Sequence, residues 1–416
     1  MPADRDTNKN GVVPPLEAIG KEGRPEGLME KGLPAALREE KPPKALGKKG
    51  LPDALGNEGL PMTFGKEELP ETLGKLPDAL GEEELSETLG KLPDALGEEE
   101  MLKLGEQFFR WVAERYRVRS SGIYHPDPRI MALAEKNGLV CLPVHFYSPI
   151  PSREDITRYD ASRYGTGGID WNDDRQLDYL RQCAPFEKEL LNCPKRRRNG
   201  ADFYWDNDSF SYSDAAFYYS LIRIARPRKI VEIGAGNSTR LAVRAIRQMN
   251  ANPADILDII EPFPSKDVAN LAESSGANLM RGRLQDVPLA YFRSLGEGDI
   301  LFYDGSHVSK YGSDVNYFML SILPELNSGV YVHVHDIFMP DDMPKEWVEK
   351  LHLYWNEQYV LHAFLMYNRA FEIIFASHYL SRKYKEMLDR YLTAPAAVKQ
   401  NGGASIWLRK ASAPAQ

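Results

Sequence analysis

Residues 230–239 read IVEIGAGNST, a short apolar run that leads through a carboxylate into a glycine-rich turn. Residues 229–234 (KIVEIG) predict a buried strand, and residues 239–249 (TRLAVRAIRQM) predict an amphipathic helix. Gly234 and Gly236 allow the backbone between them to turn sharply and to approach a ligand closely. A strand, a glycine turn and a helix form the unit from which parallel α/β sheets with ligand sites are built.

The same alternation continues toward the C-terminus. Further strands are expected at 256–261, 277–282, 299–305, 329–336, 371–377 and 405–410, with helices at 266–276, 286–295 and 313–326. Strands that alternate with helices predict a parallel sheet. We therefore expect an α/β fold with a doubly wound, mostly parallel, seven-stranded Rossmann-like sheet, in which the last strand runs antiparallel at the edge.

The residues around the glycine turn distinguish two classes of ligand. Dinucleotides require the pattern G-x-G-x-x-G, but Thr239 occupies the third glycine position. Glu232 would repel a pyrophosphate, whereas it suits a cationic ligand. S-adenosylmethionine carries a sulfonium and an ammonium group and has no phosphate. Glu261 ends the second strand, 25 residues after Gly236, where a carboxylate can accept both ribose hydroxyls.

These residues carry a resemblance. The segment 229–340, with VEIGAGNST at its start, resembles the class I S-adenosylmethionine-dependent methyltransferases, in particular a bacterial branch similar to small-molecule and sugar O-methyltransferases. The resemblance extends over residues 138–410. It implies S-adenosyl-L-methionine as the cofactor, with the ribose at Glu261. The other implied cofactor contacts are Glu232, Gly234, Gly236, Asn237 and Ser238 at the amino-acid end, and Gln285 and Asp286 at the adenine.

A second constellation comprises Asp304, His307, His335 and Asp336. Asp304 and Asp336 end neighbouring strands of the expected sheet, so their carboxylates converge near the methyl acceptor. The arrangement is similar to that of metal-dependent O-methyltransferases, which implies Mg²⁺ or another divalent cation at Asp304 and Asp336. His335 departs from that pattern because Mg²⁺ prefers oxygen ligands. His335 and His307 are therefore alternative general bases, and His333 is interpreted as a core residue.

Several segments outside the sheet are candidates for the acceptor site. The aromatic run at 203–219 supplies either a wall of that site or core residues, and the proline-rich loop at 143–151 is a candidate cover. The helical insert at 344–368 is a second lid or a dimer surface. The basic run KRRR at 195–198 either attracts a phosphorylated acceptor or forms a solvated loop.

The chain divides into three regions by composition. Residues 1–104 contain repeats of the pattern LPxxLG, with LPDALG at 51, 76 and 92. Such short, glycine-interrupted units bury too little apolar surface to offset the entropy of ordering, so we interpret the region as a disordered tether. An array of docking motifs for a protein partner is the alternative. Residues 105–212 are expected to form an N-terminal helical cap and substrate region, and residues 213–412 the methyltransferase catalytic domain.

The amino-acid composition indicates in which cellular compartment the protein is expected and which classes of partner it is expected to bind. The net charge of −8 argues against a nucleic-acid-binding protein, and no apolar run is long enough to span a membrane. Three cysteines without zinc spacing, Cys141, Cys183 and Cys193, and a start without a secretory signal favour a cytoplasmic location. A small-molecule acceptor is the expected partner, and homo-oligomerisation stays open.

Together these features predict transfer of a methyl group from S-adenosylmethionine to a hydroxyl, on a saccharide or a secondary metabolite, with or without a divalent metal. Two alternatives remain. An NAD(P)-dependent oxidoreductase would bind a nicotinamide dinucleotide at the same turn. A catalytically silent adaptor with a methyltransferase fold would act through the N-terminal repeats.

Overall fold

The computed structural model describes residues 97–118, 124–125, 127–158, 164–198, 202–210, 212–395 and 402–412. The chain divides into two units at residue 101, and of the first unit only residues 97–101 are described. The expected disorder of the repeats therefore lies outside the described residues, except for their last part. There a helix begins at Glu98, ahead of the expected region boundary at residue 104.

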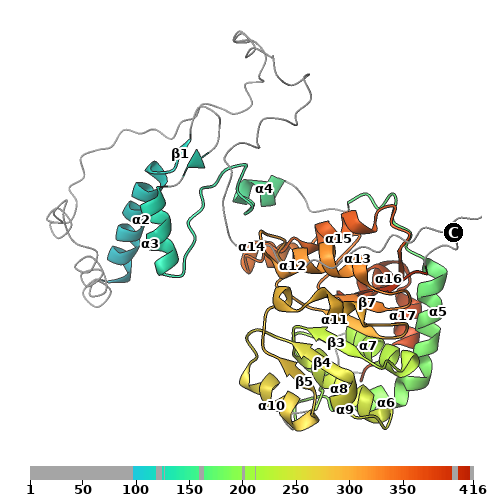
Figure 1. Ribbon diagram of the computed structural model, residues 1–416. Coiled ribbons are helices and arrows are strands. Elements are labelled where there is room, and N and C mark those ends of the chain that lie inside the picture. Colours follow the sequence, from blue (N-terminus) through green and yellow to red (C-terminus); the bar gives the residue numbers. More distant parts are fainter. Residues whose placement is uncertain are drawn as a thin grey trace, which may run out of the picture. The chain divides into compact units, whose positions relative to one another are not determined.

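One sheet of seven strands organises the second unit (Figure 1), in the order β5-β4-β3-β6-β7-β9-β8. The strands are β3 (Ile230–Ile233), β4 (Leu257–Ile260), β5 (Asn278–Met280), β6 (Ile300–Tyr303), β7 (Tyr331–Val334), β8 (Phe371–Ala376) and β9 (Ile406–Lys410). The pairs among β3 to β7 are parallel, and β9 runs antiparallel to both of its neighbours. The predicted fold class is confirmed. The prediction that the last strand lies at the edge is wrong, because β9 inserts between β7 and β8.

The helices follow the predicted alternation. They are α2 (Glu98–Glu114), α3 (Pro128–Lys136), α4 (Arg153–Arg158), α5 (Asp173–Cys183), α6 (Glu187–Leu191), α7 (Tyr212–Ala225), α8 (Asn237–Gln248), α9 (Pro253–Ile256), α10 (Lys266–Ser275), α11 (Leu289–Arg293), α12 (Asp314–Tyr317), α13 (Leu323–Glu325), α14 (Lys345–Lys350), α15 (Glu357–Leu365), α16 (Ser377–Lys383) and α17 (Lys385–Tyr391). A π-helical stretch, Phe318–Ile322, joins α12 to α13, and two short strands, β1 (Arg117–Val118) and β2 (Tyr124–His125), pair with each other.

The two faces of the sheet carry separate apolar cores because strand side chains alternate between faces. One core joins the sheet to α5, α7, α8 and α17 and contains Phe217, Leu241 and Trp407. The other joins it to α11, α12, α13 and α15 and contains Phe292 and Phe318. With both faces covered, the central strands β3, β4, β6 and β7 are buried along their length, whereas the edge strand β5 is partly exposed.

The described part of the chain contains no helix that is both long enough and apolar enough to cross a bilayer. All three cysteines are free. Ser213 is the second residue of α7, and its hydroxyl donates to the carbonyl of Gly402 at 3.3 Å. This bond ties α7 to the segment that leads into β9.

Candidate active site

The glycine turn lies between the ends of three strands. The amide of Gly234 donates to the carbonyl of Ile260 at 3.1 Å, and the amide of Asp304 donates to the carbonyl of Ile233 at 2.9 Å. Gly234 has a φ of +83°, and a Cβ there would overlap the carbonyl oxygen of Asp304. Only glycine therefore allows β3 and β6 to meet this closely.

Gly236 differs from Gly234 in both conformation and surroundings. Its φ of 178° is extended backbone, and a Cβ built on it has open space around it. Its amide donates to the hydroxyl of Thr239 at 3.0 Å, which fixes the first turn of α8. The start of this helix thus presents unobstructed backbone to the edge of the sheet.

Glu232 is fully buried on the face of the sheet that α7 and α8 cover. Burial raises the pKa of its carboxyl to about 7, although hydrogen bonds from the hydroxyls of Thr239 and Ser238 act in the opposite direction. Its Oε2 has no hydrogen-bond partner among the described residues. The carboxylate predicted to face the cofactor therefore lies beneath the turn, where it contacts the start of α8.

Because Glu232 is buried, we expect the effect of Glu232→Gln on the free energy of unfolding to depend on pH. The folded protein binds the proton more tightly than the unfolded chain, in which the carboxyl has its ordinary pKa of 4.5, so the wild type loses stability as the pH rises through about 7. Glutamine does not titrate. The free energy of unfolding of the variant relative to wild type should therefore rise by about 3 kcal/mol between about pH 4 and about pH 8. Urea denaturation at both pH values checks this, and a difference independent of pH would contradict it.

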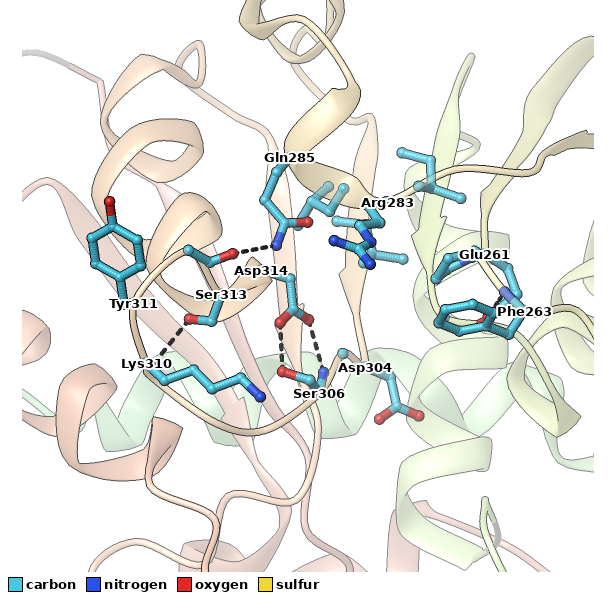
Figure 2. A pocket seen from close by; sticks show the side chains of 17 residues that line it. Glu261, Phe263, Arg283, Gln285, Asp304, Ser306, Lys310, Tyr311, Ser313 and Asp314 are labelled. Atoms are coloured by element: carbon cyan, nitrogen blue, oxygen red, sulfur yellow. Dashed lines mark hydrogen bonds between the residues drawn. The ribbon is translucent and has the colours of Figure 1, made fainter. Parts of the chain in front are cut away.

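The first cavity, of about 560 Å³, opens beside the turn at the ends of β3, β4 and β6. Glu261 and Phe263 lie on one side of it and Lys310 and Tyr311 on the other, with Asp304 at its lower edge (Figure 2). Phe263 is 80% exposed, so its ring is available to a ligand. The amide of Phe263 donates to Glu261 Oε1 at 2.8 Å and orients that carboxylate.

The structure brings some predicted cofactor residues to this cavity and not others. Gly234, Glu261 and Gln285 line it, and Gln285 also donates from Nε2 to the carbonyl of Gly312 at 2.7 Å. Asp286 is exposed and does not line it. Arg283 also lines it, as does Lys310. The cavity therefore carries charges of both signs, whereas the charged residues that the sequence assigned to the cofactor are all acidic.

Asn237 and Ser238 have other partners. The side-chain amide of Asn237 donates to Asn207 Oδ1 at 3.2 Å and to Ser209 Oγ at 2.9 Å. The side chain of Ser238 is buried, and it acts to lower the pKa of Glu232. Neither residue lines the first cavity. In this structure they fix the loop before α7 and the buried carboxylate.

Three ionisable side chains form a row at the ends of β6 and β7, which we call the charged row: Asp304, His307 and Asp336. His307 Nε2 lies 3.3 Å from Asp304 Oδ1 and 3.9 Å from Asp336 Oδ2. His307 and Asp336 both have left-handed backbone, with φ of 61° and 54°. Non-glycine residues in this conformation are strained, and such strain concentrates at functional sites.

The first residue of α15 and the segment before it fix His307 from three directions. Glu357, which is 2% exposed, bonds to its Nδ1, and the ring of Trp355 stacks on the imidazole at 4.0 Å between centroids. The amides of Asn356 and Glu357 donate to the carbonyl of His307. Sequence reasoning missed Glu357, because nothing in the pattern of the insert relates it to a histidine fifty positions earlier.

Mutual contact shifts the pKa values in the charged row. Burial lowers the pKa of His307, but bonds to Asp304 and Glu357 outweigh it and raise the pKa to about 10. Burial raises the pKa of Asp304, and the charges of His335 and His307 more than offset this, so the net shift is downward. For Asp336 the effect of burial exceeds that of the His335 and His307 charges, so its pKa is raised. His307 is thus a cation held against carboxylates.

His335 and His333 share a partner, the hydroxyl of Ser405 at the start of β9. His333 Nε2 lies 2.9 Å from Ser405 Oγ, and His335 Nδ1 lies 3.3 Å from it. His333 is fully buried and stacks on Phe302, as expected of a core residue. His335 Nε2 lies 3.8 Å from Asp336 Oδ1, so it joins the edge of the charged row.

The described residues contain no evident binding site for the expected divalent cation. Among the described residues, no group of three or more His, Cys, Asp or Glu side chains is arranged to hold a metal ion. His307 already contacts both carboxylates to which the ion was assigned, Asp304 and Asp336. The residues as placed do not fit a metal, and the metal remains a prediction.

A second cavity, of about 590 Å³, lies on the other side of the charged row. Asp336 and His335 line it, together with the loop at 205–210, the backbone at 402–404 and Trp347 of α14. Trp205 and Phe210 line it although both are buried, so the aromatic run serves as core and as wall. Trp347 belongs to the insert at 344–368, so part of the insert lines this cavity, as expected of a lid. The loop at 143–151, the other candidate cover, lines neither cavity.

Comparisons with known proteins match the part of the chain that contains these residues. A family model described as "Methyltransferase domain" matches residues 231–337, which include the glycine turn and the charged row. A protein of Archaeoglobus fulgidus named "Uncharacterized protein" is 30% identical over 172 residues, 39% of this chain and 77% of that relative.

Two solved structures are also similar. The S-adenosylhomocysteine-bound methyltransferase PaMTH1 of Podospora anserina is 18% identical, with a TM-score of 0.30 over 48% of this chain and 78% of that one. The plantazolicin methyltransferase BpumL, in complex with a substrate analogue and S-adenosylhomocysteine, is 14% identical, with a TM-score of 0.26 over 58% of this chain and 100% of that one.

The matched domain begins one residue into β3 and ends just beyond β7. It therefore contains the strands that carry Gly234, Glu261, Asp304 and Asp336. A methyltransferase sheet order and a methyltransferase domain thus coincide on the same residues, and the chain belongs to the class I S-adenosylmethionine-dependent methyltransferases.

Proposed function

We propose that the protein transfers the methyl group of S-adenosylmethionine to a hydroxyl group of a small-molecule acceptor that binds in the second cavity. The observation that carries the proposal is the position of the charged row. Asp304 lines the first cavity, Asp336 lines the second, and His307 contacts both of them. A donor and an acceptor bound on either side would meet at this row.

The first cavity fits the cofactor. Its volume of about 560 Å³ is in the range of small-molecule sites. Gly236 does not line it, but the missing side chain of Gly236 leaves open space beside the helix start. A carboxylate has about four acceptor positions, so the bond from Phe263 leaves room on Glu261 for the ribose hydroxyls. Gln285 is placed to contact the adenine. When bound, the cofactor supplies an electrophilic methyl group.

The chain's own task is to position the acceptor hydroxyl and to receive its proton. The sulfonium is intrinsically reactive, so alignment and exclusion of water contribute much of the rate. The Asp336 carboxylate is the proton acceptor that reaches the second cavity, and burial raises its pKa, which suits that role. His307, already charged, balances the two carboxylates instead of acting as the base expected from the sequence.

A chelator tests whether a metal takes part. Because His307 supplies the positive charge between Asp304 and Asp336, EDTA should leave turnover within about twofold of the untreated enzyme. The rate is measured with methyl-labelled cofactor before and after dialysis against EDTA. A loss that Mg²⁺ or Mn²⁺ restores would instead place a metal at the row.

Isothermal titration with S-adenosylhomocysteine tests the cofactor site. Glu261→Ala removes the hydrogen bonds of a charged group and should weaken binding by about 10- to 100-fold. Glu273→Ala, the same change on an exposed turn of α10, is the control and should bind like wild type. Equal affinity of the two variants would refute the ribose assignment. Binding of NAD(H) in place of S-adenosylhomocysteine would favour an oxidoreductase.

The acceptor is sought in a small-molecule cell extract. The purified protein is incubated with the extract and methyl-labelled cofactor, and mass spectrometry locates the labelled compound. A labelled ether supports transfer to oxygen, and a label on nitrogen or carbon would contradict it. Absence of label despite binding of S-adenosylhomocysteine would favour a catalytically silent adaptor.

A further inference from the structure

The second cavity has a strongly asymmetric charge. The carboxylates of Asp206, Asp208, Asp214 and Asp336 line it, and no lysine or arginine stands among the described residues of its wall. The first cavity, by contrast, has Arg283 and Lys310 among its lining residues. The electrostatic potential that a ligand meets therefore differs between the first and the second cavity.

The carboxylates of the second cavity differ in how they are used by the fold. Asp214 accepts from the amides of Ala404 and Ser405 at 2.9 and 3.1 Å, so it is structural. Asp206 lies 3.6 Å from Arg196 in an exposed pair. Asp208 is exposed and makes no hydrogen bond or ion pair with any described residue. Its carboxylate is exposed to solvent and is therefore open to a ligand in the cavity.

The two imidazoles of this wall do not offset the carboxylates. His335 lies 3.8 Å from Asp336, and His378 lies 2.9 Å from Asp341. Asp336 also contacts His307. Even with both imidazoles charged, the four carboxylates outnumber them, so the described part of the wall stays negative. An anionic group such as a phosphate would be repelled there, whereas a cation would be attracted.

Aromatic side chains supply the rest of the wall. Trp347 packs edge-on against Phe338 and Trp355, with centroids 5.3 and 5.6 Å apart, which fixes the orientation of its ring. Trp205 and Phe210 are held in the core and also line the cavity. Fixed aromatic faces bind ring compounds by stacking and bind cations through their quadrupole.

We propose that the acceptor is a hydroxylated ring compound that carries an ammonium group, of the amino-sugar or aminocyclitol class, and not a phosphorylated sugar. This inference rests on the proposed function and adds the charge of its substrate. The hydroxyl meets the charged row at Asp336, the ring lies against Trp347, and the ammonium group pairs with Asp208.

The basic run at 195–198 does not argue for a phosphorylated acceptor. Arg196 pairs with Asp206, and Arg197 pairs with Asp267 at 2.7 Å. Neither arginine lines the second cavity. The structure thus supports the interpretation of this run as a solvated loop.

Charge-based fractionation tests the inference even while the acceptor is unidentified. A small-molecule extract is separated by ion exchange into cationic, neutral and anionic fractions, and each is incubated with the full-length protein and methyl-labelled cofactor. Most of the label should appear in the cationic fraction. Label in the neutral or the anionic fraction would overturn the charge assignment and leave methyl transfer intact. No label in any fraction would overturn the proposed function itself, and this inference with it.

The labelled fraction then serves as the substrate for a variant pair. Asp208→Asn should raise KM about tenfold with kcat retained, and raising the salt concentration should narrow the difference from wild type. Asp255→Asn, the same change at an exposed position of α9, should match wild type. Equal KM values for the two variants would exclude Asp208 as the partner of the ammonium group.

Discussion

Replacing Asp304 by asparagine should reduce turnover by about 1,000-fold and change the affinity for S-adenosylhomocysteine by only a few-fold. The amide keeps the shape of the side chain but cannot carry the negative charge that holds His307 Nε2 at 3.3 Å. Without that charge, the imidazolium is drawn toward Asp336 and competes for the carboxylate that receives the acceptor proton. Single-turnover rates with saturating labelled cofactor measure the loss, and isothermal titration measures the affinity.

A second aspartate controls for the substitution. Asp255 is exposed in α9, next to the start of β4 and therefore at the opposite end of the strand from the site. Asp255→Asn should leave rate and affinity unchanged. If Asp304→Asn retains turnover within about tenfold of wild type while its melting curve is unchanged, the chemistry does not depend on the charged row.

Much of the fold was predictable because its signals are local. The strand at Ile230–Ile233 is a short apolar run before a glycine turn, and α8 shows a clear helical period. Gly276 ends α10 with a φ of 80°, as a glycine after a helical run indicates. Signals of this kind lie within a few residues of the feature they specify.

The errors concern relations between distant segments. The position of β9 between β7 and β8 depends on side-by-side packing of strands far apart in the chain, which period and composition do not encode. One deviation is local: the segment 313–326 has one continuous helical pattern, yet its middle widens into a π-helical stretch. Glu357 reaches His307 only because the insert folds back over the end of β6.

The site shows the same division. The sequence predicts that glycines and strand-end carboxylates meet, because parallel strands bring their carboxyl ends together, and Gly234, Glu261 and Asp304 do line one cavity. Glu232 was assigned to the cofactor from its charge alone, but its register places it beside Phe302 on the face covered by α7 and α8. Successive side chains along β3 point to opposite faces of the sheet. This alternation directs the Glu232 carboxylate toward the start of α8 and away from the first cavity.

Gly234→Ala should destabilise the protein by about 3 kcal/mol and abolish measurable cofactor binding. A methyl group at this position overlaps the carbonyl oxygen of Asp304, which is backbone and cannot rotate away. Alanine is also strained at a φ of +83°. The end of β6 must therefore move, and with it Asp304 and the lining of the first cavity. Urea denaturation and titration with S-adenosylhomocysteine measure the two effects.

Gly236→Ala is the control that distinguishes a steric clash from the mere loss of a glycine. Gly236→Ala places the same methyl group two residues later, at an extended φ of 178° and in open space, so stability should change by less than about 1 kcal/mol. That open space is where the cofactor is expected, so Gly236→Ala should still weaken binding. Loss of binding in both variants with loss of stability only in Gly234→Ala would show that one glycine lets two strands approach while the other leaves room for the ligand. Equal stability of the two would mean that the contact between Gly234 and Asp304 is looser than the structure has it.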